Sequence, residues 1–213
     1  MARRVRAGDG LTGLAARRLR ATHAWAGVAA LLCTAALIGW PIEREALDWQ
    51  PALAFTQPWR AITAVAVHYN GIHLAGAIAG TVLTGALGVA ANVPARIVWA
   101  WLVAWPLTQF GLLIKPELLH YGGVSGVVHA GVAAVIVFLL VQKQRTQRLI
   151  GAAMLIGILI KVLGETPWGP ALRHPEGWGI AVAPIAHATG AVAGAVCALI
   201  ALLFHPPHRT DPE

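Results

Sequence analysis

The sequence predicts an all-α membrane protein, a polytopic bundle of six transmembrane helices. Of its 213 residues, 57% are hydrophobic and only 12% are charged, whereas soluble domains carry roughly 25% charged residues. Apolar segments recur along the chain, with Lys and Arg concentrated in alternate gaps between them. The 23 glycines suit helices that approach closely in lipid, which favours a helical bundle over a barrel.

Each predicted span is an apolar segment of about 20 residues, the length that crosses the hydrocarbon core. The candidates are 22–41, 61–90, 96–114, 124–141, 148–163 and 180–204. The second is long enough to contain a re-entrant or tilted start, and the fifth is short. We expect a basic N-terminal segment at 1–21, a six-helix membrane domain at 22–204 and a tail at 205–213, with the first span uncleaved.

The distribution of basic residues predicts the orientation. Eleven of the sixteen Lys and Arg residues lie in gaps on the same side as the N-terminus, among them Arg3, Arg4, Arg6 and Arg209. The other five lie in gaps on the opposite side. Because basic loops stay in the cytoplasm, we expect both termini there. The net charge of +7 is then a topology signal, and no nucleic-acid partner is expected.

This topology brings polar residues of three helices to one depth. The second, fourth and sixth helices run from outside to inside, so their first turns lie together just below the outer surface. Near those starts are His68, His73, Ser125, His129 and His187. Ionisable side chains at such depth are usually functional.

Ser125 is the only serine of the chain, and it lies between Gly123 and Gly126. A serine hydroxyl becomes a nucleophile when a base takes its proton, and His is the usual base. The flanking glycines allow tight packing and expose backbone N–H groups that could hold an oxyanion. A lone serine at a glycine-rich helix start is also a common cap or packing residue, which leaves two interpretations open.

His187 precedes a small-residue face formed by Gly190 and Gly194, which predicts close packing of the sixth helix and an imidazole directed into the interface. No Asp or Glu occurs inside any predicted span, so a serine enzyme here would use a Ser-His dyad. We expect packing to orient His187. His129, one helical turn after Ser125, is positioned to stack beside it.

The second helix opens with His68 and His73. An imidazole at this position could donate to the oxyanion of a tetrahedral intermediate, together with the Ser125 N–H. The alternative is a structural histidine that bonds loop carbonyls. We favour the structural role for His68 and leave both roles open for His73.

Three separated motifs resemble the rhomboid intramembrane proteases. They are Trp59-Arg60 followed by His68 and His73, then Gly123-Val-Ser-Gly126, then Ala186-His187-x-x-Gly190-x-x-x-Gly194. The resemblance covers about 22–204. It implies a hydrolase with Ser125 as nucleophile, His187 as base and His73 assisting the oxyanion, acting on membrane proteins near the outer face.

Within that family the chain most resembles the rhombosortases, through Gln57-Pro-Trp-Arg60 and through His129, where many rhomboids have Tyr. That resemblance implies a multi-pass protein of the bacterial inner (plasma) membrane. It also implies single-span substrates with a C-terminal Gly-Gly motif, an apolar helix and a basic tail. One position departs from the family, because Ala77 stands where an oxyanion-binding Asn is usual. The substitution puts part of the oxyanion site in doubt.

Two alternatives remain open at this point. One is a non-catalytic rhomboid-like protein that binds client helices. The departure at Ala77 favours it, and the presence of both catalytic residues argues against it. In the other, the four histidines His68, His73, His129 and His187 ligate haem or a metal. We expect no cofactor and no metal, because a lone serine between glycines is not what a metal site requires. The role of Lys161, near the outer end of the fifth helix, is left unexplained.

Overall fold

The computed structural model describes residues 7–177 and 179–204 of the chain. Within these ranges the backbone is helical apart from connecting loops and two isolated bridges, Trp49–Tyr121 and Arg173–Val182. The expected tail at 205–213 and four of the topology-setting cations lie outside the described residues: Arg3, Arg4, Arg6 and Arg209.

Long helices make up the bundle: α1 (Ala7–Gly39), α4 (Gly71–Ala90), α5 (Ala95–Phe110), α6 (Ser125–Leu140), α7 (Arg145–Gly164) and α8 (Pro184–Leu203). Short helices lie between them: α2 (Arg44–Leu47), η1 (Pro51–Leu53), α3 (Arg60–Thr63), η2 (Ala64–Ala66) and η3 (Gly111–Ile114). Of the described residues, five stretches are long and apolar enough to cross a membrane, and α6 is a shorter apolar helix. The predicted all-α polytopic architecture is confirmed.

Three boundaries differ from the sequence prediction. Helix α1 starts at Ala7, so residues 7–21 continue the first helix. The second apolar segment is broken, with α3 and η2 preceding α4, as its length had indicated. Helix α7 is longer than predicted, with 20 residues, because a polar first turn beginning at Arg145 precedes its apolar residues. Helix α6 is the shorter of the two, with 16 residues.

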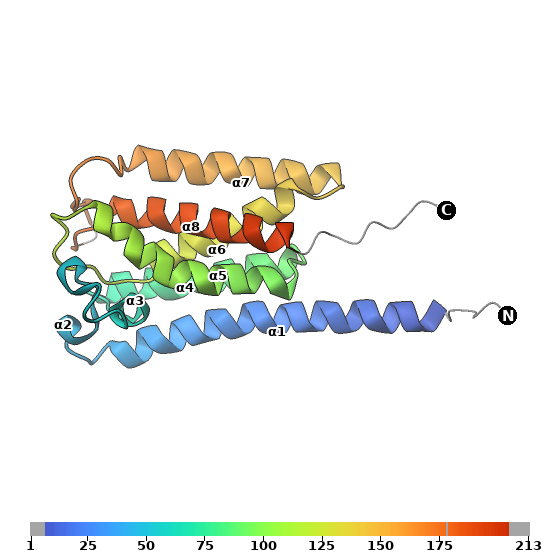
Figure 1. Ribbon diagram of the computed structural model, residues 1–213, viewed down its shortest axis with the longest axis horizontal. Coiled ribbons are helices and arrows are strands. Elements are labelled where there is room, and N and C mark those ends of the chain that lie inside the picture. The colour runs from blue at the N-terminus through green and yellow to red at the C-terminus, as the bar shows by residue number, and fades with distance from the viewer. Residues whose placement is uncertain (1–6, 178, 205–213) are drawn as a thin grey trace.

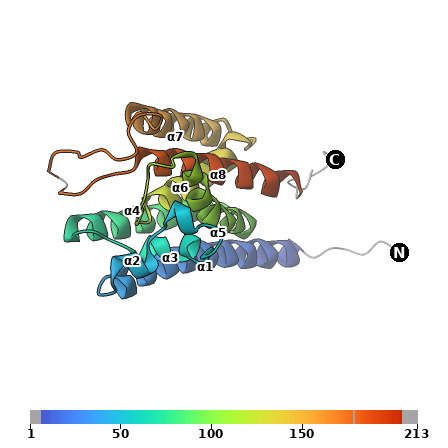
Figure 2. The same cartoon turned by 60° about the vertical axis from the view of Figure 1, so that its left-hand side comes forward.

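Helix α6 lies at the centre of the bundle. It packs most extensively on α8 and also contacts α4, α5 and α7, while α1 covers α4 and α5. Figures 1 and 2 show α1 and α7 on opposite sides of this arrangement. Trp25 of α1 stacks on Trp101 of α5 with 5.4 Å between ring centroids, and the Trp101 indole N–H donates to the Val127 carbonyl at 2.7 Å.

The starts of α4, α6 and α8 lie at one end of the bundle, together with the end of α7. The segments 40–70, 115–124, 165–177 and 179–183 gather at this end, and the start of α1 and the end of α8 lie at the other (Figure 1). The segment that joins α7 to α8 projects from the same end (Figure 2). The polar residues at the helix starts are therefore brought to one depth, as the sequence predicted.

Candidate active site

Ser125 and His187 face each other across the α6–α8 contact. Ser125 is the first residue of α6, and His187 lies in the first turn of α8 with only 5% of its surface exposed. The distance from Ser125 Oγ to His187 Nε2 is 3.1 Å. This is hydrogen-bonding distance, the geometry that a nucleophile and its base require.

The close approach of α6 and α8 depends on the predicted small-residue face. A Cβ added at Gly190 would lie 1.9 Å from the carbonyl oxygen of Gly126, and one at Gly194 would lie 2.0 Å from that of Ala130. A Cβ at Gly126 would in turn lie 2.7 Å from the Ala186 carbonyl oxygen. No larger side chain fits at these positions, so the glycines set the spacing that lets Ser125 reach His187.

His129 lies beside His187, as the sequence predicted. The two rings stack with centroids 4.3 Å apart and an interplanar angle of 16°. Its Nδ1 lies 2.7 Å from the carbonyl oxygen of Ser125. Since a carbonyl only accepts, Nδ1 of His129 carries the hydrogen, and the ring is held by its own helix.

Glu165 contacts the far side of His187, and sequence reasoning missed it. Its Oε2 lies 2.5 Å from His187 Nδ1. The sequence interpretation excluded a third member because no acid lies within a span. Glu165 follows the last residue of α7, at the depth where α8 begins, so an acid outside the spans still reaches the histidine.

The Glu165 carboxylate also pairs with Lys161, one turn earlier on α7. Lys161, whose role the sequence left unexplained, therefore has a carboxylate partner. Burial raises the pKa of Glu165, but the hydrogen bonds and charges of His187 and Lys161 outweigh it and lower the pKa to about 2. The carboxylate is thus ionised at neutral pH.

His73 reaches the site from the first turn of α4. Its Nδ1 accepts from the Tyr69 backbone N–H at 3.3 Å, so in the neutral ring Nε2 carries the hydrogen. A Cβ at Gly123 would lie 2.9 Å from that Nε2, which places the nitrogen over the loop before Ser125. His73 therefore presents an N–H donor beside Gly123, two residues before the serine, in the same cavity lining.

Gly123 does not offer the backbone donor that the sequence suggested. Its N–H donates to the Ala64 carbonyl at 2.8 Å, because this loop is tied to η2. Its φ of +126° lies in a region that disfavours side chains. The glycine is needed for this conformation and for the close approach of His73.

His68 has a structural role at this site, and Ala77 contributes no polar group to it. His68 is 3% exposed, and its Nδ1 lies 3.3 Å from the Ala66 carbonyl oxygen, which fits the structural role that the sequence favoured. Burial lowers the pKa of His68, and the Ala66 bond partly offsets this. Ala77 lines the cavity and supplies no donor, while Asn70 caps α4 by accepting from the His73 N–H.

Tyr121 is a second residue that sequence reasoning did not assign. It is 6% exposed, lines the cavity, and its hydroxyl makes no hydrogen bond within the described part of the chain. Burial raises the pKa of Tyr121, and the neighbouring Ser125 side chain and Gly126 backbone lower it. A protonated phenol beside the serine is a further donor.

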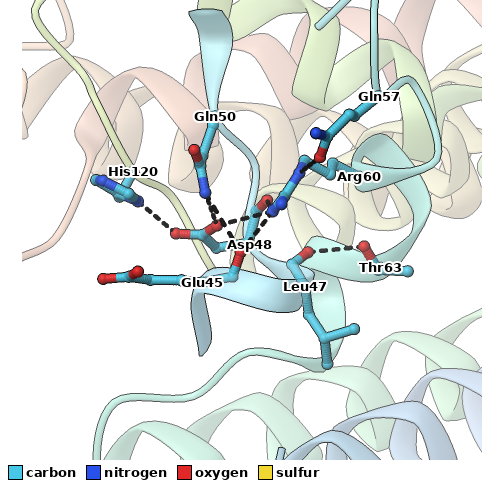
Figure 3. A network of polar contacts seen from close by, with 8 residues as sticks. All are labelled: Glu45, Leu47, Asp48, Gln50, Gln57, Arg60, Thr63 and His120. Atoms are coloured by element: carbon cyan, nitrogen blue, oxygen red, sulfur yellow. Dashed lines mark hydrogen bonds and ion pairs between the residues drawn. The ribbon is translucent and has the colours of Figure 1, made fainter. Parts of the chain in front are cut away.

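The Trp59-Arg60 motif supports the site from a distance. Arg60 is buried, and its Nη1 donates to the carbonyls of Glu45 and Asp48 and pairs with Asp48 Oδ1 at 3.2 Å. Asp48 Oδ2 lies 2.7 Å from His120 Nδ1 (Figure 3). This network joins the loop after α1 to the segment just before Ser125, whereas Trp59 is 54% exposed.

A cavity of about 780 Å³ opens over these residues. It is lined from α4, α6, α8 and the end of α7 by His73, Ala77, Ser125, His129, Glu165 and His187. Arg44, His120 and Lys161 add polar groups to the lining. The cavity is large enough for several residues of an extended peptide beside the serine.

The alternative metal-site interpretation has little geometric support. Within residues 7–177 and 179–204, no three His, Cys, Asp or Glu side chains are grouped as metal ligands. Both ring nitrogens of His187 face other partners, Ser125 and Glu165, and Nδ1 of His129 faces a carbonyl. The histidines are arranged in pairs rather than around one point.

Comparison with known families identifies the architecture. The family model of the Rhomboid domain matches residues 56–204, well over half of the chain. The chain belongs to the rhomboid family. Comparisons with curated proteins and with solved structures gave no match.

Rhomboid domains are generally found in intramembrane serine proteases whose substrates are membrane proteins in a lipid bilayer. The match includes all three motifs, from Trp59 to Gly194, together with Glu165. This rhomboid protein is therefore a multi-pass membrane protein. Its α1 and the loop up to Phe55 lie before the matched range.

Proposed function

We propose that this rhomboid protein is an active intramembrane serine endopeptidase that cleaves membrane-anchored proteins near the outer face of the membrane. The observation that carries the proposal is the 3.1 Å contact between Ser125 Oγ and His187 Nε2 inside a cavity of about 780 Å³. A packing serine would not need a histidine at this distance. Membership of the rhomboid family supports the same reaction.

In the proposed reaction, Ser125 Oγ attacks the scissile carbonyl while His187 Nε2 accepts the hydroxyl proton. His187 then gives this proton to the leaving amine, which leaves an acyl-enzyme on Ser125. A water molecule, activated by the same imidazole, hydrolyses the ester. Ring stacking by His129 keeps the plane of His187 fixed through these steps.

The tetrahedral intermediate places negative charge beside Ser125. The donors that support it are the Ser125 N–H in the first turn of α6, His73 Nε2–H and the Tyr121 hydroxyl. These groups compensate for Ala77. A single donor of this kind typically contributes about 10²–10³ in rate, so replacing one by another preserves a working site.

The substrate class follows from the rhombosortase resemblance. We propose single-span proteins in the bacterial inner membrane with a C-terminal Gly-Gly motif, an apolar helix and a basic tail. A Gly-Gly pair resists helix formation, so it leaves the scissile bond extended at the membrane surface. Such a segment fits a cavity that is lined by residues near the starts of α4, α6 and α8.

Proteoliposomes test this proposal. Purified protein and Ser125→Ala are reconstituted with a single-span reporter that carries the Gly-Gly segment, and with a matched Leu-Leu reporter. We expect wild type to cleave the Gly-Gly reporter in preference to the Leu-Leu reporter, and Ser125→Ala to cleave neither. Equal cleavage of both reporters would refute the substrate class, and cleavage of neither, with stable reporter capture by both proteins, would favour a client-binding role.

A further inference from the structure

We infer that Glu165 is a positioning residue of the catalytic group: its carboxylate holds His187 in the tautomer and orientation that accept the Ser125 proton. The inference rests on the proposed protease function and deepens it. It replaces the dyad expected from the sequence with a Ser-His-Glu arrangement whose acid lies just beyond the end of α7.

The contacts of His187 determine its protonation pattern. Nδ1 lies 2.5 Å from Glu165 Oε2, and an ionised carboxylate only accepts hydrogen bonds. Nδ1 therefore carries the hydrogen. A neutral imidazole has one such hydrogen, so Nε2, 3.1 Å from Ser125 Oγ, presents its lone pair to the hydroxyl.

The backbone around Glu165 is held in place by the following loop. The Arg173 guanidinium donates to the Glu165 carbonyl at 3.0 Å. Lys115 Nζ donates to the Gly169 carbonyl at 2.7 Å, and the Gly169 N–H donates to the Thr166 carbonyl at 2.8 Å. An acid in a loose surface loop would not be fixed in this way.

The charges around the carboxylate come from three helices. His187 approaches from α8, Lys161 from the last turn of α7, and His129 from α6. Arg173 contacts the backbone carbonyl and the Thr166 hydroxyl. With a pKa of about 2, the carboxylate keeps its charge across the neutral range, so it can stabilise the imidazolium formed when His187 takes the serine proton.

Lys161 moderates this effect. Its ammonium pairs with Oε1 while His187 uses Oε2, so the carboxylate is shared between the ammonium and the imidazole. Removing the ammonium leaves the carboxylate to the imidazolium alone. Lys161 and Glu165 are therefore expected to act in opposite directions on the pH dependence of the base.

The expected cost of losing Glu165 is intermediate. Asparagine in place of the acid of a buried triad costs about 10⁴ in rate, because the histidine adopts the wrong tautomer. Here the Glu165 side chain is 24% exposed, and His129 also supports the imidazole. We therefore expect Glu165→Gln to slow acylation by about 10²-fold.

The test is the second-order rate of labelling by a fluorophosphonate probe as a function of pH, in detergent. Glu165→Gln is expected to lower the plateau and to move the acid limb, where the base becomes protonated, about one pH unit lower. Glu165→Asp should recover part of the rate. The matched control is Glu117→Gln, because Glu117 also pairs with a lysine, Lys115, but is exposed.

The outcomes separate the two proposals. Wild-type labelling lost in Ser125→Ala, with an unchanged rate and profile in Glu165→Gln, would overturn the role of Glu165 and leave the protease intact. No labelling of wild type would overturn both. If Glu165→Gln does not fold, Lys161→Met decides: an acid limb moved to higher pH supports the inference, and an unmoved limb contradicts it.

Discussion

Glu165 Oε2 lies 2.5 Å from His187 Nδ1, although the two residues are 22 positions apart. The contact extends a line of polar groups that runs from Ser125 through His187 and Glu165 to Lys161. Its members come from α6, α8 and the end of α7. The relative placement of these helices is therefore part of the active site.

Acid stability reports on this contact without any substrate. The pKa of Glu165 falls from 4.5 to about 2, so its contribution to folded stability is full above about pH 4.5 and is lost as the pH falls toward 2. We expect the difference in melting temperature between wild type and Glu165→Gln to shrink across this window. A difference that stays constant with pH would contradict the lowered pKa.

The α6–α8 crossing predicts a strong effect of one methyl group. In Gly190→Ala, the new Cβ would lie 1.9 Å from the Gly126 carbonyl oxygen, so the helices must move apart. We expect a loss of about 2 kcal/mol or more in unfolding free energy, together with lost serine reactivity. Gly27→Ala on α1 is the control, because nothing lies within 4 Å of its Cβ position. Equal stability of the two variants would refute the close crossing.

The Arg60 network predicts a stability defect away from the catalytic residues. Asp48→Asn leaves the buried Arg60 guanidinium without its counter-charge, and the side chains of this pair are 10% and 4% exposed. Breaking a buried pair typically costs about 3 kcal/mol, which thermal unfolding in detergent would show. The exposed Glu117 is the control, and Glu117→Gln should change the melting temperature little. A stable Asp48→Asn would show that Arg60 does not depend on this carboxylate.

His73 offers a test of the oxyanion site. His73→Ala removes the Nε2–H donor while Ser125 and His187 remain, so we expect probe labelling to slow by about 10²-fold. The control is His23→Ala, which removes an exposed imidazole on α1. A labelling rate equal to that of wild type would assign His73 to structure alone.

Much of this arrangement is encoded in local patterns. Hydropathy predicted the spans, and the alternation of basic gaps predicted that the starts of α4, α6 and α8 share one depth. Helical spacing then predicted the stacking of His129 on His187, and the small residues Gly190 and Gly194 predicted the close crossing. These features depend on periodicity and on residue size.

The contacts missed by the sequence connect irregular segments. Glu165 lies outside every predicted span, although its spacing from Lys161 is that of neighbours on one helix face. The loop bond between the Gly123 N–H and Ala64 and the pairing of Asp48 with Arg60 join segments without periodicity. Such partners depend on how the loops fold over the helix ends, which composition and spacing do not specify.

The most direct test of the account is fluorophosphonate labelling of the detergent-purified protein, with Ser125→Ala and His187→Ala run beside wild type. The account predicts that wild type is labelled and that both substitutions abolish labelling while the proteins remain folded. Labelling that persists in Ser125→Ala, or its absence in folded wild type, would contradict the claim that Ser125 is an activated nucleophile.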